Sequence, residues 1–254
     1  MQKQETLTAV AISIEGLTKD YGGMRAVDNL TLSVAEAEVF GLLGPNGSGK
    51  TTTINCLTGI LRPTAGMVRV GGFDVQKETG KAREIMGVSP QETAVYPYLT
   101  GRENVQLFGE LYSVKRESLG ERVDQVMEKV GLIEVAGRKV SKYSGGMRRR
   151  VSIAMALVTD PRIILLDEPT VGMDPQARRE VWDFVMELRD RGKTVVLTTH
   201  YMEEAEDLCD RVGIIDHGRL IALGSPADLK AEYGARDLED VFIQLTGRRI
   251  REGA

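Results

Sequence analysis

The N-terminal part of the chain alternates between apolar and polar positions. Val10 and Ile12 alternate with small or polar residues, and a second alternating run covers residues 26–34, after a turn at residues 21–23. A side-chain period of two places one set of residues on each face of a sheet, so that one face is apolar and the other polar. Residues 66–75 read as a further hairpin around two adjacent glycines. The pattern therefore predicts an antiparallel β layer.

Three later runs are apolar without alternation. They cover residues 39–43, 163–166 and 195–198, and each has the length of a strand. A strand that is covered on both faces needs no polar positions, and such strands are typical of parallel sheets. A shorter run at residues 85–89 is ended by Pro90. Because helical patterns separate these runs, we expect an α/β core with a mainly parallel sheet.

The segment from about residue 100 to residue 160 follows a helical period instead. Thr100 and Glu103 have the spacing of a capping box, which predicts a helix start. A third helix is expected from Met147 to the Asp-Pro pair at residues 160–161. Between them, one helical face is formed by Val123, Val126, Met127 and Val130. These patterns predict a helical insertion between two halves of the α/β core.

Strand and helix signals then alternate to the end of the chain. Asp174 and Pro175 mark a helix start, residues 216–218 form a hairpin turn, and Ser225 begins another helix. The last predicted helix carries an apolar stripe of Leu238, Val241, Phe242 and Leu245. Most of this segment is expected to complete the sheet, and the last two helices are expected to form a C-terminal extension of the domain.

These patterns predict one domain over residues 1–254. Its core is expected to consist of residues 10–94 and 159–224, with a helical subdomain at residues 95–158 and a C-terminal helical extension at residues 225–254. A chain of this size is near the upper limit for a single hydrophobic core.

Composition and charge narrow the class of protein. Hydrophobic residues make up 42% and charged residues 28% of the 254 residues, which excludes disorder of the whole chain. The net charge of −4 gives no overall basic field, so no nucleic-acid partner is expected. Cys56 and Cys209 lie far apart, without partners at metal-ligand spacing, and read as core residues in a reducing compartment. Without an apolar run of roughly 18 residues or a signal peptide, the chain is expected neither to span a membrane nor to be exported.

The strongest chemical signal lies between residue 43 and residue 52. This segment follows an apolar strand, opens a helix and fits the pattern G-x-x-x-x-G-K-[ST]. In such a loop the backbone amides and the helix N-terminus surround phosphate oxygens, the lysine adds a positive charge, and the hydroxyl binds Mg²⁺. The alternative is a plain glycine turn before a helix. The residues expected to bind the nucleotide are Gly44, Asn46, Gly47, Ser48, Gly49, Lys50, Thr51 and Thr52.

Polar side chains follow three of the predicted strands. Asp167 and Glu168 come directly after residues 163–166, and ligands of α/β sheets bind beyond such strand ends. We expect Asp167 to hold Mg²⁺ and Glu168 to accept a proton from an attacking water. His200 ends another strand and is suited to donate to a γ-phosphate, whereas Gln91 is suited to place water or Mg²⁺. Each residue alone also has a structural reading, as an exposed turn acid, a core histidine or a turn amide.

A second candidate anion site precedes the third predicted helix. Ser144, Gly145 and Gly146 offer a hydroxyl and backbone amides at a helix N-terminus, and the arginines at positions 148–150 follow them. Positive charges are mildly unfavourable there, so an anion is expected to offset them. The alternative is a solvated arginine face.

In this order, the motifs resemble those of the nucleotide-binding domain of ABC transporters, over nearly the whole chain. Residues 44–51 look like Walker A, residues 163–168 like Walker B with its catalytic glutamate, Gln91 like the Q-loop and His200 like the switch histidine. The segment from Ser144 to Gly146 looks like the signature, which in that family closes over the ATP held by a second subunit. The resemblance therefore implies a P-loop NTPase fold and a dimer with two composite sites.

Further segments refine this resemblance. Tyr21 looks like the aromatic residue that stacks on adenine, with an ordinary turn tyrosine as the alternative, and residues 171–174 resemble the loop that crosses the dimer interface. Residues 143–150, 198–226 and 238–247 are similar to the daunorubicin-type drug-resistance exporters related to the A subfamily. The signature departs from the commonest form, because it begins with tyrosine and ends with methionine.

The resemblance implies an ATP-hydrolysing subunit that dimerises on MgATP, with itself or with a second ABC ATPase, to power a separate integral membrane permease. Glu168, His200, Lys50 and Gln91 are then the catalytic residues, and Thr51, Gln91 and Asp167 hold the metal. We expect an exporter of drugs, lipids or similar compounds at the cytoplasmic face of the membrane, docked through an apolar groove on the helical segment. The alternatives are a soluble ABC ATPase for cofactor assembly or DNA-associated work, and a nucleotide-gated binding module with little turnover.

Overall fold

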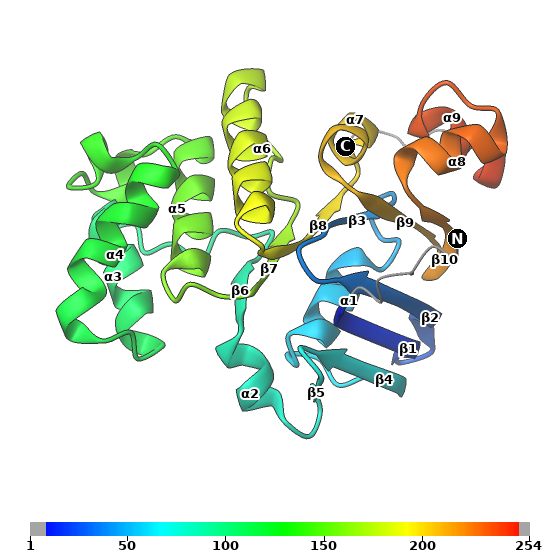
Figure 1. Cartoon of the computed structure of the whole chain (residues 1–254), viewed down its shortest axis with the longest axis horizontal. Coiled ribbons are helices and arrows are strands. Elements are labelled where there is room, and N and C mark those ends of the chain that lie inside the picture. Colours follow the sequence, from blue (N-terminus) through cyan, green and yellow to red (C-terminus); the bar gives the residue numbers. More distant parts are fainter. Residues whose placement is uncertain (1–8, 249–254) are drawn as a thin grey trace, which may run out of the picture.

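The computed structural model describes residues 9–248 and contains two β-sheets (Figure 1). The smaller sheet has the strand order β2-β1-β4-β5, and the larger has the order β10-β9-β3-β8-β7-β6. The strands are β1 Val10–Tyr21, β2 Met24–Ala35, β3 Val39–Leu43, β4 Ala65–Val70, β5 Phe73–Asp74, β6 Met86–Ser89, β7 Ile163–Asp167, β8 Thr194–Thr199, β9 Arg211–Asp216 and β10 Arg219–Gly224.

The helices fill the spaces between and around these sheets (Figure 1). They are α1 Lys50–Leu57, α2 Thr79–Glu84, α3 Gly101–Leu111, α4 Arg116–Lys129, α5 Gly145–Leu157, α6 Pro175–Asp190, α7 Met202–Leu208, α8 Pro226–Tyr233 and α9 Leu238–Thr246, with short 3₁₀ turns at Ile133–Val135 and Val140–Lys142. None of the helices in the described chain is both long enough and apolar enough to cross a membrane.

The larger sheet is mainly parallel, as predicted. β3 pairs in parallel with β8 and β9, β7 pairs in parallel with β6 and β8, and only the pair of β9 with β10 is antiparallel. Every residue of β3, β7 and β8 is buried, which explains why these strands carry no alternation. The parallel arrangement brings the carboxyl ends of β3, β7 and β8 to the same edge of the sheet.

Alternate side chains of the central strands enter two different hydrophobic cores. Phe40 and Leu165 join the core shared with α1 and the antiparallel sheet. Val39 and Leu166, one position away along each strand, join the core formed with the helical segment, α6, α7 and α9. The larger sheet is therefore the middle layer of the molecule, with helices on one face and α1 with the smaller sheet on the other (Figure 1).

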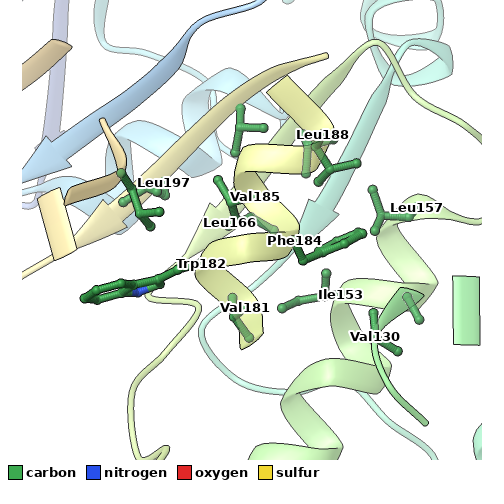
Figure 2. Close-up of a cluster of buried hydrophobic side chains, with 14 of the residues drawn as sticks. Val130, Ile153, Leu157, Leu166, Val181, Trp182, Phe184, Val185, Leu188 and Leu197 are labelled. Atoms are coloured by element: carbon green, nitrogen blue, oxygen red, sulfur yellow. The ribbon is translucent and has the colours of Figure 1, made fainter. Parts of the chain in front are cut away.

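The helical insertion consists of α3, α4 and α5, which all lie inside residues 95–158. Thr100 and Glu103 form the predicted capping box at the start of α3. Figure 2 shows how the insertion joins the core: Phe184 of α6 points toward α5, where Ile153 and Leu157 lie. Movement of α5 relative to α6 would therefore expose apolar surface.

The C-terminal helices pack on the core with the predicted stripe. Leu238, Val241 and Phe242 of α9 are buried, and α9 contacts α7 and α8. Lys230 of α8 also forms an ion pair with Glu206 of α7. The last residues of the predicted extension, 249–254, lie outside the described chain.

The structure differs from the sequence prediction in a few elements. The short helices α2 and α7 were not predicted, and α5 begins at Gly145, two residues before the predicted start at Met147. The early start has a local cause, because the Ser144 side chain accepts a hydrogen bond from the Met147 amide and caps the helix. Cys56 and Cys209 are buried and unpaired, as expected, and burial raises the pKa of Cys56 to about 11.

Candidate active site

The loop between β3 and α1 depends on glycine at two crowded positions. A Cβ at Gly44 would lie 2.2 Å from the carbonyl oxygen of Ile215, so no side chain fits there. Gly49, the N-cap of α1, has a φ of 107°, which other residues rarely adopt. The loop therefore turns sharply into α1, and the first-turn amides of that helix, which have no partners within it, face the loop. This arrangement is suited to bind an anion.

Lys50 lies inside this loop and is only 4% exposed. Its Nζ donates hydrogen bonds to the carbonyl oxygens of Gly44 at 2.8 Å and Pro45 at 3.1 Å, and lies 3.5 Å from Oε1 of Glu168. Burial lowers the pKa of Lys50, while the attraction to Glu168 and Asp167 partly restores it. The lysine thus links the phosphate loop to the strand-end carboxylate.

Asp167 and Glu168 lie at the end of β7, and both form hydrogen bonds with Thr198. Asp167 pairs in register with Thr198 of β8, and the Thr198 hydroxyl donates a hydrogen bond to Oδ1 of Asp167. The same hydroxyl accepts a hydrogen bond of 2.9 Å from the Glu168 amide. Thr198 therefore orients both acids, a role that the sequence analysis did not assign to it.

Three of the predicted site residues converge on the Glu168 carboxylate. Lys50 Nζ lies 3.5 Å and His200 Nδ1 3.3 Å from Oε1, and Gln91 donates from Nε2 to Oε2 at 3.0 Å. These residues follow β3, β8 and β6, so the shared edge of the parallel sheet brings them together. The His200 contact is a hydrogen bond when Nδ1 carries the proton.

Glu168 is held in two unusual ways. Its φ is 51°, in the left-handed region that non-glycine residues seldom occupy, and it is 6% exposed. Burial alone would raise the pKa of Glu168, but the hydrogen bond with His200 and the charge of Lys50 outweigh it, so the pKa is lowered. A carboxylate that stays ionised at neutral pH is able to accept a proton.

Tyr21 lies at the end of β1, away from this cluster. It is 40% exposed, and Lys19 Nζ lies 5.1 Å from the centre of its ring. An exposed aromatic ring of this kind is able to stack on a base. In the described chain no hydrogen bond or ion pair joins Tyr21 to the phosphate loop.

The segment from Ser144 to Gly146 also lies apart from the phosphate loop. It belongs to the helical insertion, and no hydrogen bond or ion pair within residues 9–248 connects it to Lys50 or its neighbours. Ser144 accepts the capping bond from Met147 but keeps its O–H hydrogen to donate. The described residues of one chain therefore show no contact that joins the two candidate anion-binding segments into a single site.

Two of the three consecutive arginines of α5 bond to other segments of the chain. Arg149 is 4% exposed and donates to the backbone carbonyl oxygens of Pro90, Gln91, Asp167 and Pro169. Arg150 instead pairs with Glu180 of α6 at 2.7 Å. Both guanidinium groups thus have partners within residues 9–248, and Arg149 is not part of a solvated arginine face.

Glu204 of α7 is a buried acid that the sequence analysis missed. Its Oε1 accepts hydrogen bonds from Thr170 Oγ1 at 2.8 Å and from Trp182 Nε1 at 3.1 Å, whereas Oε2 has no hydrogen-bond partner among residues 9–248. Burial raises the pKa of Glu204 above its ordinary value. Trp182, labelled in Figure 2, is the only tryptophan in the sequence.

We expect Glu204→Gln to stabilise the protein at alkaline pH. The folded state holds the Glu204 proton more tightly than the unfolded state, so this group makes the protein less stable as the pH rises from 4.5 through the raised pKa. Glutamine never ionises, and the variant should melt about 2–4 °C higher at pH 8, with a smaller gain at pH 5. Melting curves by circular dichroism measure this. Glu203→Gln, on the exposed side of α7, should show no such dependence, and an equal gain at both pH values would contradict the assignment.

The fold and the glycine-rich loop define a P-loop nucleoside triphosphatase. The family model for ABC transporters matches residues 27–171, and the chain belongs to that family. It is 44% identical over 241 residues to the linearmycin resistance ATP-binding protein LnrL of Bacillus subtilis, covering 95% of this chain and 76% of that protein. It is 46% identical over 228 residues to the daunorubicin/doxorubicin resistance ATP-binding protein DrrA of Streptomyces peucetius, covering 90% of this chain and 69% of that protein.

A solved structure agrees with this assignment. The ATP-binding cassette MJ0796, determined as a dimer in a post-hydrolysis state with ADP and Pi, superimposes with a TM-score of 0.78 at 28% identity, over 84% of this chain and 98% of that one. The chain is thus an ATPase of the ABC type, as its motifs implied.

Proposed function

We propose that this chain is the ATP-hydrolysing subunit of an exporter, in which two such ATPase subunits close on MgATP and drive a separate membrane permease. The observation that carries the site assignment is the convergence of Lys50, Gln91 and His200 on one ionised carboxylate, Glu168. This arrangement supports a general base whose position depends on several segments of the chain. The names of the relatives, both drug-resistance ATP-binding proteins, support export.

The residues present fit a magnesium ion that is bound together with a nucleotide. Mg²⁺ is usually held by one or two carboxylates together with substrate phosphates, and it keeps several waters as further ligands. Thr51 Oγ1, the Asp167 carboxylate and the Gln91 amide oxygen would hold it in this way. The buried hydroxyl of Ser48 in the same loop has no hydrogen-bond partner in the part of the chain that the structure describes, which supports a polar ligand there. When bound, Mg²⁺ would neutralise charge on the phosphate oxygens.

The residues of the chain then have separate roles in hydrolysis. A triphosphate entering the loop competes with Glu168 for Lys50, because it carries more negative charge than the carboxylate. Glu168, released from this ion pair, accepts the proton of the attacking water, while Gln91 and His200 keep the carboxylate oriented. Lys50 and the amides of the loop bind the phosphates, and Tyr21 stacks on the base.

The second anion-binding segment supports dimerisation. Ser144, Gly145 and Gly146 present an N-terminal helix end that does not reach the phosphate loop of the same chain. In a head-to-tail dimer, this segment would cover the triphosphate held by the partner subunit, whether that partner is a second copy or another ABC ATPase. Anions between the two faces reduce the repulsion of their positive ends, so the dimer should require the nucleotide.

An apolar groove is the proposed docking site for the permease. It has a volume of about 250 Å³ and lies between the helical insertion and the α/β core, not on the insertion alone as expected. Ile60 and Tyr112 are exposed at its edge, and such exposed apolar patches are typical of interaction sites. Other lining residues include Val88, Phe108 and Met155. A permease docked there would hold the chain at the cytoplasmic face of the membrane.

Copurification tests this proposal. The chain should copurify with a multispan membrane protein from the cells that produce it, and the double variant Ile60→Asp and Tyr112→Asp should recover at least about tenfold less of it, because it places two charges in an apolar contact. Leu111→Asp, which changes an exposed neighbour outside the groove lining, is the matched control. An active ATPase that stays free of any membrane protein would favour the non-transport alternative.

A further inference from the structure

Within the described residues, Arg149 is a buried guanidinium that bonds only to backbone oxygens. It is 4% exposed, and no ion pair in the described part of the chain includes it. Its Nε donates to Pro169 O at 3.2 Å and its Nη1 to Gln91 O at 2.9 Å, and further bonds reach Pro90 O and Asp167 O. Burying a charge without such partners would be strongly unfavourable, so these four oxygens are needed to hold it.

The four oxygens belong to two segments that flank the proposed site. Pro90 and Gln91 follow β6, whereas Asp167 and Pro169 surround Glu168 at the end of β7. Arg149 itself lies on α5, the helix that begins with the signature segment. One side chain of the helical insertion thus bonds the backbone on both sides of the contact between Gln91 Nε2 and Glu168 Oε2.

The charge of Arg149 is also matched to the acids nearby. Burial lowers the pKa of Arg149 to about 10, and attraction to Asp167, Glu168 and Glu204 opposes this decrease. The guanidinium therefore stays positive at neutral pH. Its donors lie on three nitrogens of one rigid plane and so reach oxygens on two separate segments, whereas the three donors of a lysine all lie on one nitrogen atom.

We propose that Arg149 is a positioning residue, which fixes the Gln91 amide on the Glu168 carboxylate and makes that contact depend on the position of α5. The proposal deepens the proposed function and rests on Glu168 as the general base. When α5 moves with the helical insertion, Arg149 displaces the two backbone segments to which it bonds. The distance between the Gln91 amide and the Glu168 carboxylate then changes. A partner that contacts the helical insertion would thereby influence hydrolysis without touching the nucleotide.

The test compares Arg149→Met and Arg149→Lys with the wild-type full-length chain. Misplacement of a catalytic group by about 1 Å costs on the order of 10²-fold in rate, so we expect Arg149→Met to lower kcat about 10- to 100-fold, with the dissociation constant for MgATP changed less than about twofold. Arg149→Lys keeps the positive charge but not the planar fork of donors, so its kcat should lie between those of the wild type and Arg149→Met. Arg122→Met is the matched control, because Arg122 also donates to backbone oxygens, those of Leu157 and Val158, away from the site; its kcat should stay unchanged.

A double variant separates positioning from general loss of structure. If Arg149 acts through Glu168, Arg149→Met should lower the residual single-turnover rate of Glu168→Gln less than about twofold, because the coupled group is already lost. The proposal would be overturned if the rate losses of the two single variants multiply in the double variant. It would also be overturned if Arg149→Met folds and has the wild-type kcat. If Arg149→Met does not fold, Arg149→Lys replaces it in the kcat measurement and in the double variant. An unchanged kcat in Arg149→Lys would then also contradict the proposal. Full hydrolysis by Glu168→Gln alone would refute the proposed general base instead.

Discussion

Glu168→Gln is expected to bind MgATP as tightly as the wild-type chain and to hydrolyse it about 10²–10⁴-fold more slowly. Glutamine has the same shape and still accepts a hydrogen bond from Lys50, but it has no basic oxygen for the proton of water. Loss of the negative charge also removes repulsion of the triphosphate. The variant should therefore accumulate as a MgATP-bound dimer, if two chains close over the nucleotide as proposed.

Two measurements check this result. Single-turnover hydrolysis gives the rate, and size-exclusion chromatography with MgATP or MgADP gives the oligomeric state. Glu117→Gln removes the same charge from an exposed position of α4 and should hydrolyse ATP normally as a dimer that turns over. Adding Ser144→Phe should prevent the dimer without weakening ATP binding. Wild-type hydrolysis in Glu168→Gln would show that another group is the base.

Lys50→Met is expected to lower kcat/KM by about 10²–10³-fold, because it removes a charged donor aimed at the phosphates. Lys50 also lowers the pKa of Glu168 in the folded protein, so that pKa should rise in the variant. In contrast with Glu168→Gln, the nucleotide affinity itself should fall, since the lysine is proposed to bind the triphosphate before hydrolysis.

Isothermal titration with MgATP and steady-state kinetics test this difference. Lys81→Met, which removes an exposed lysine of α2, is the control and should leave both quantities unchanged. Binding of MgATP to Lys50→Met with wild-type affinity would contradict the role of Lys50 in the phosphate loop. It would leave the separate assignment of Glu168 intact.

Burial revealed the central strands in the sequence, whereas short length hid two of the helices. β3, β7 and β8 were predicted because each is wholly buried and reads as a continuous apolar run. α2 and α7 were missed because six or seven residues make less than two helical turns, too few for a period to appear. Their exposed or charged sequences gave no apolar run to mark them either.

The candidate site was predictable where function depends on local sequence. The phosphate loop, Asp167, Glu168 and His200 all follow strands, and the strand order then brings them together. The contributions of Thr198, Glu204 and Arg149 arise from side chains that meet across different elements. Three consecutive arginines gave no sign that the middle one turns inward, because backbone oxygens are present at every residue and leave no trace in a sequence.

The left-handed backbone at Glu168 has a consequence for evolution and engineering in the laboratory. A residue with a Cβ costs about 1–2 kcal/mol in this conformation, whereas glycine relieves most of that strain. Loss of the acid would, however, leave the buried Lys50 ammonium without its carboxylate partner, which costs about 3–5 kcal/mol and exceeds the strain that is relieved. A laboratory selection for heat tolerance alone should therefore keep the acid at this strained position, because the ion pair stabilises the fold by more than the backbone strain costs.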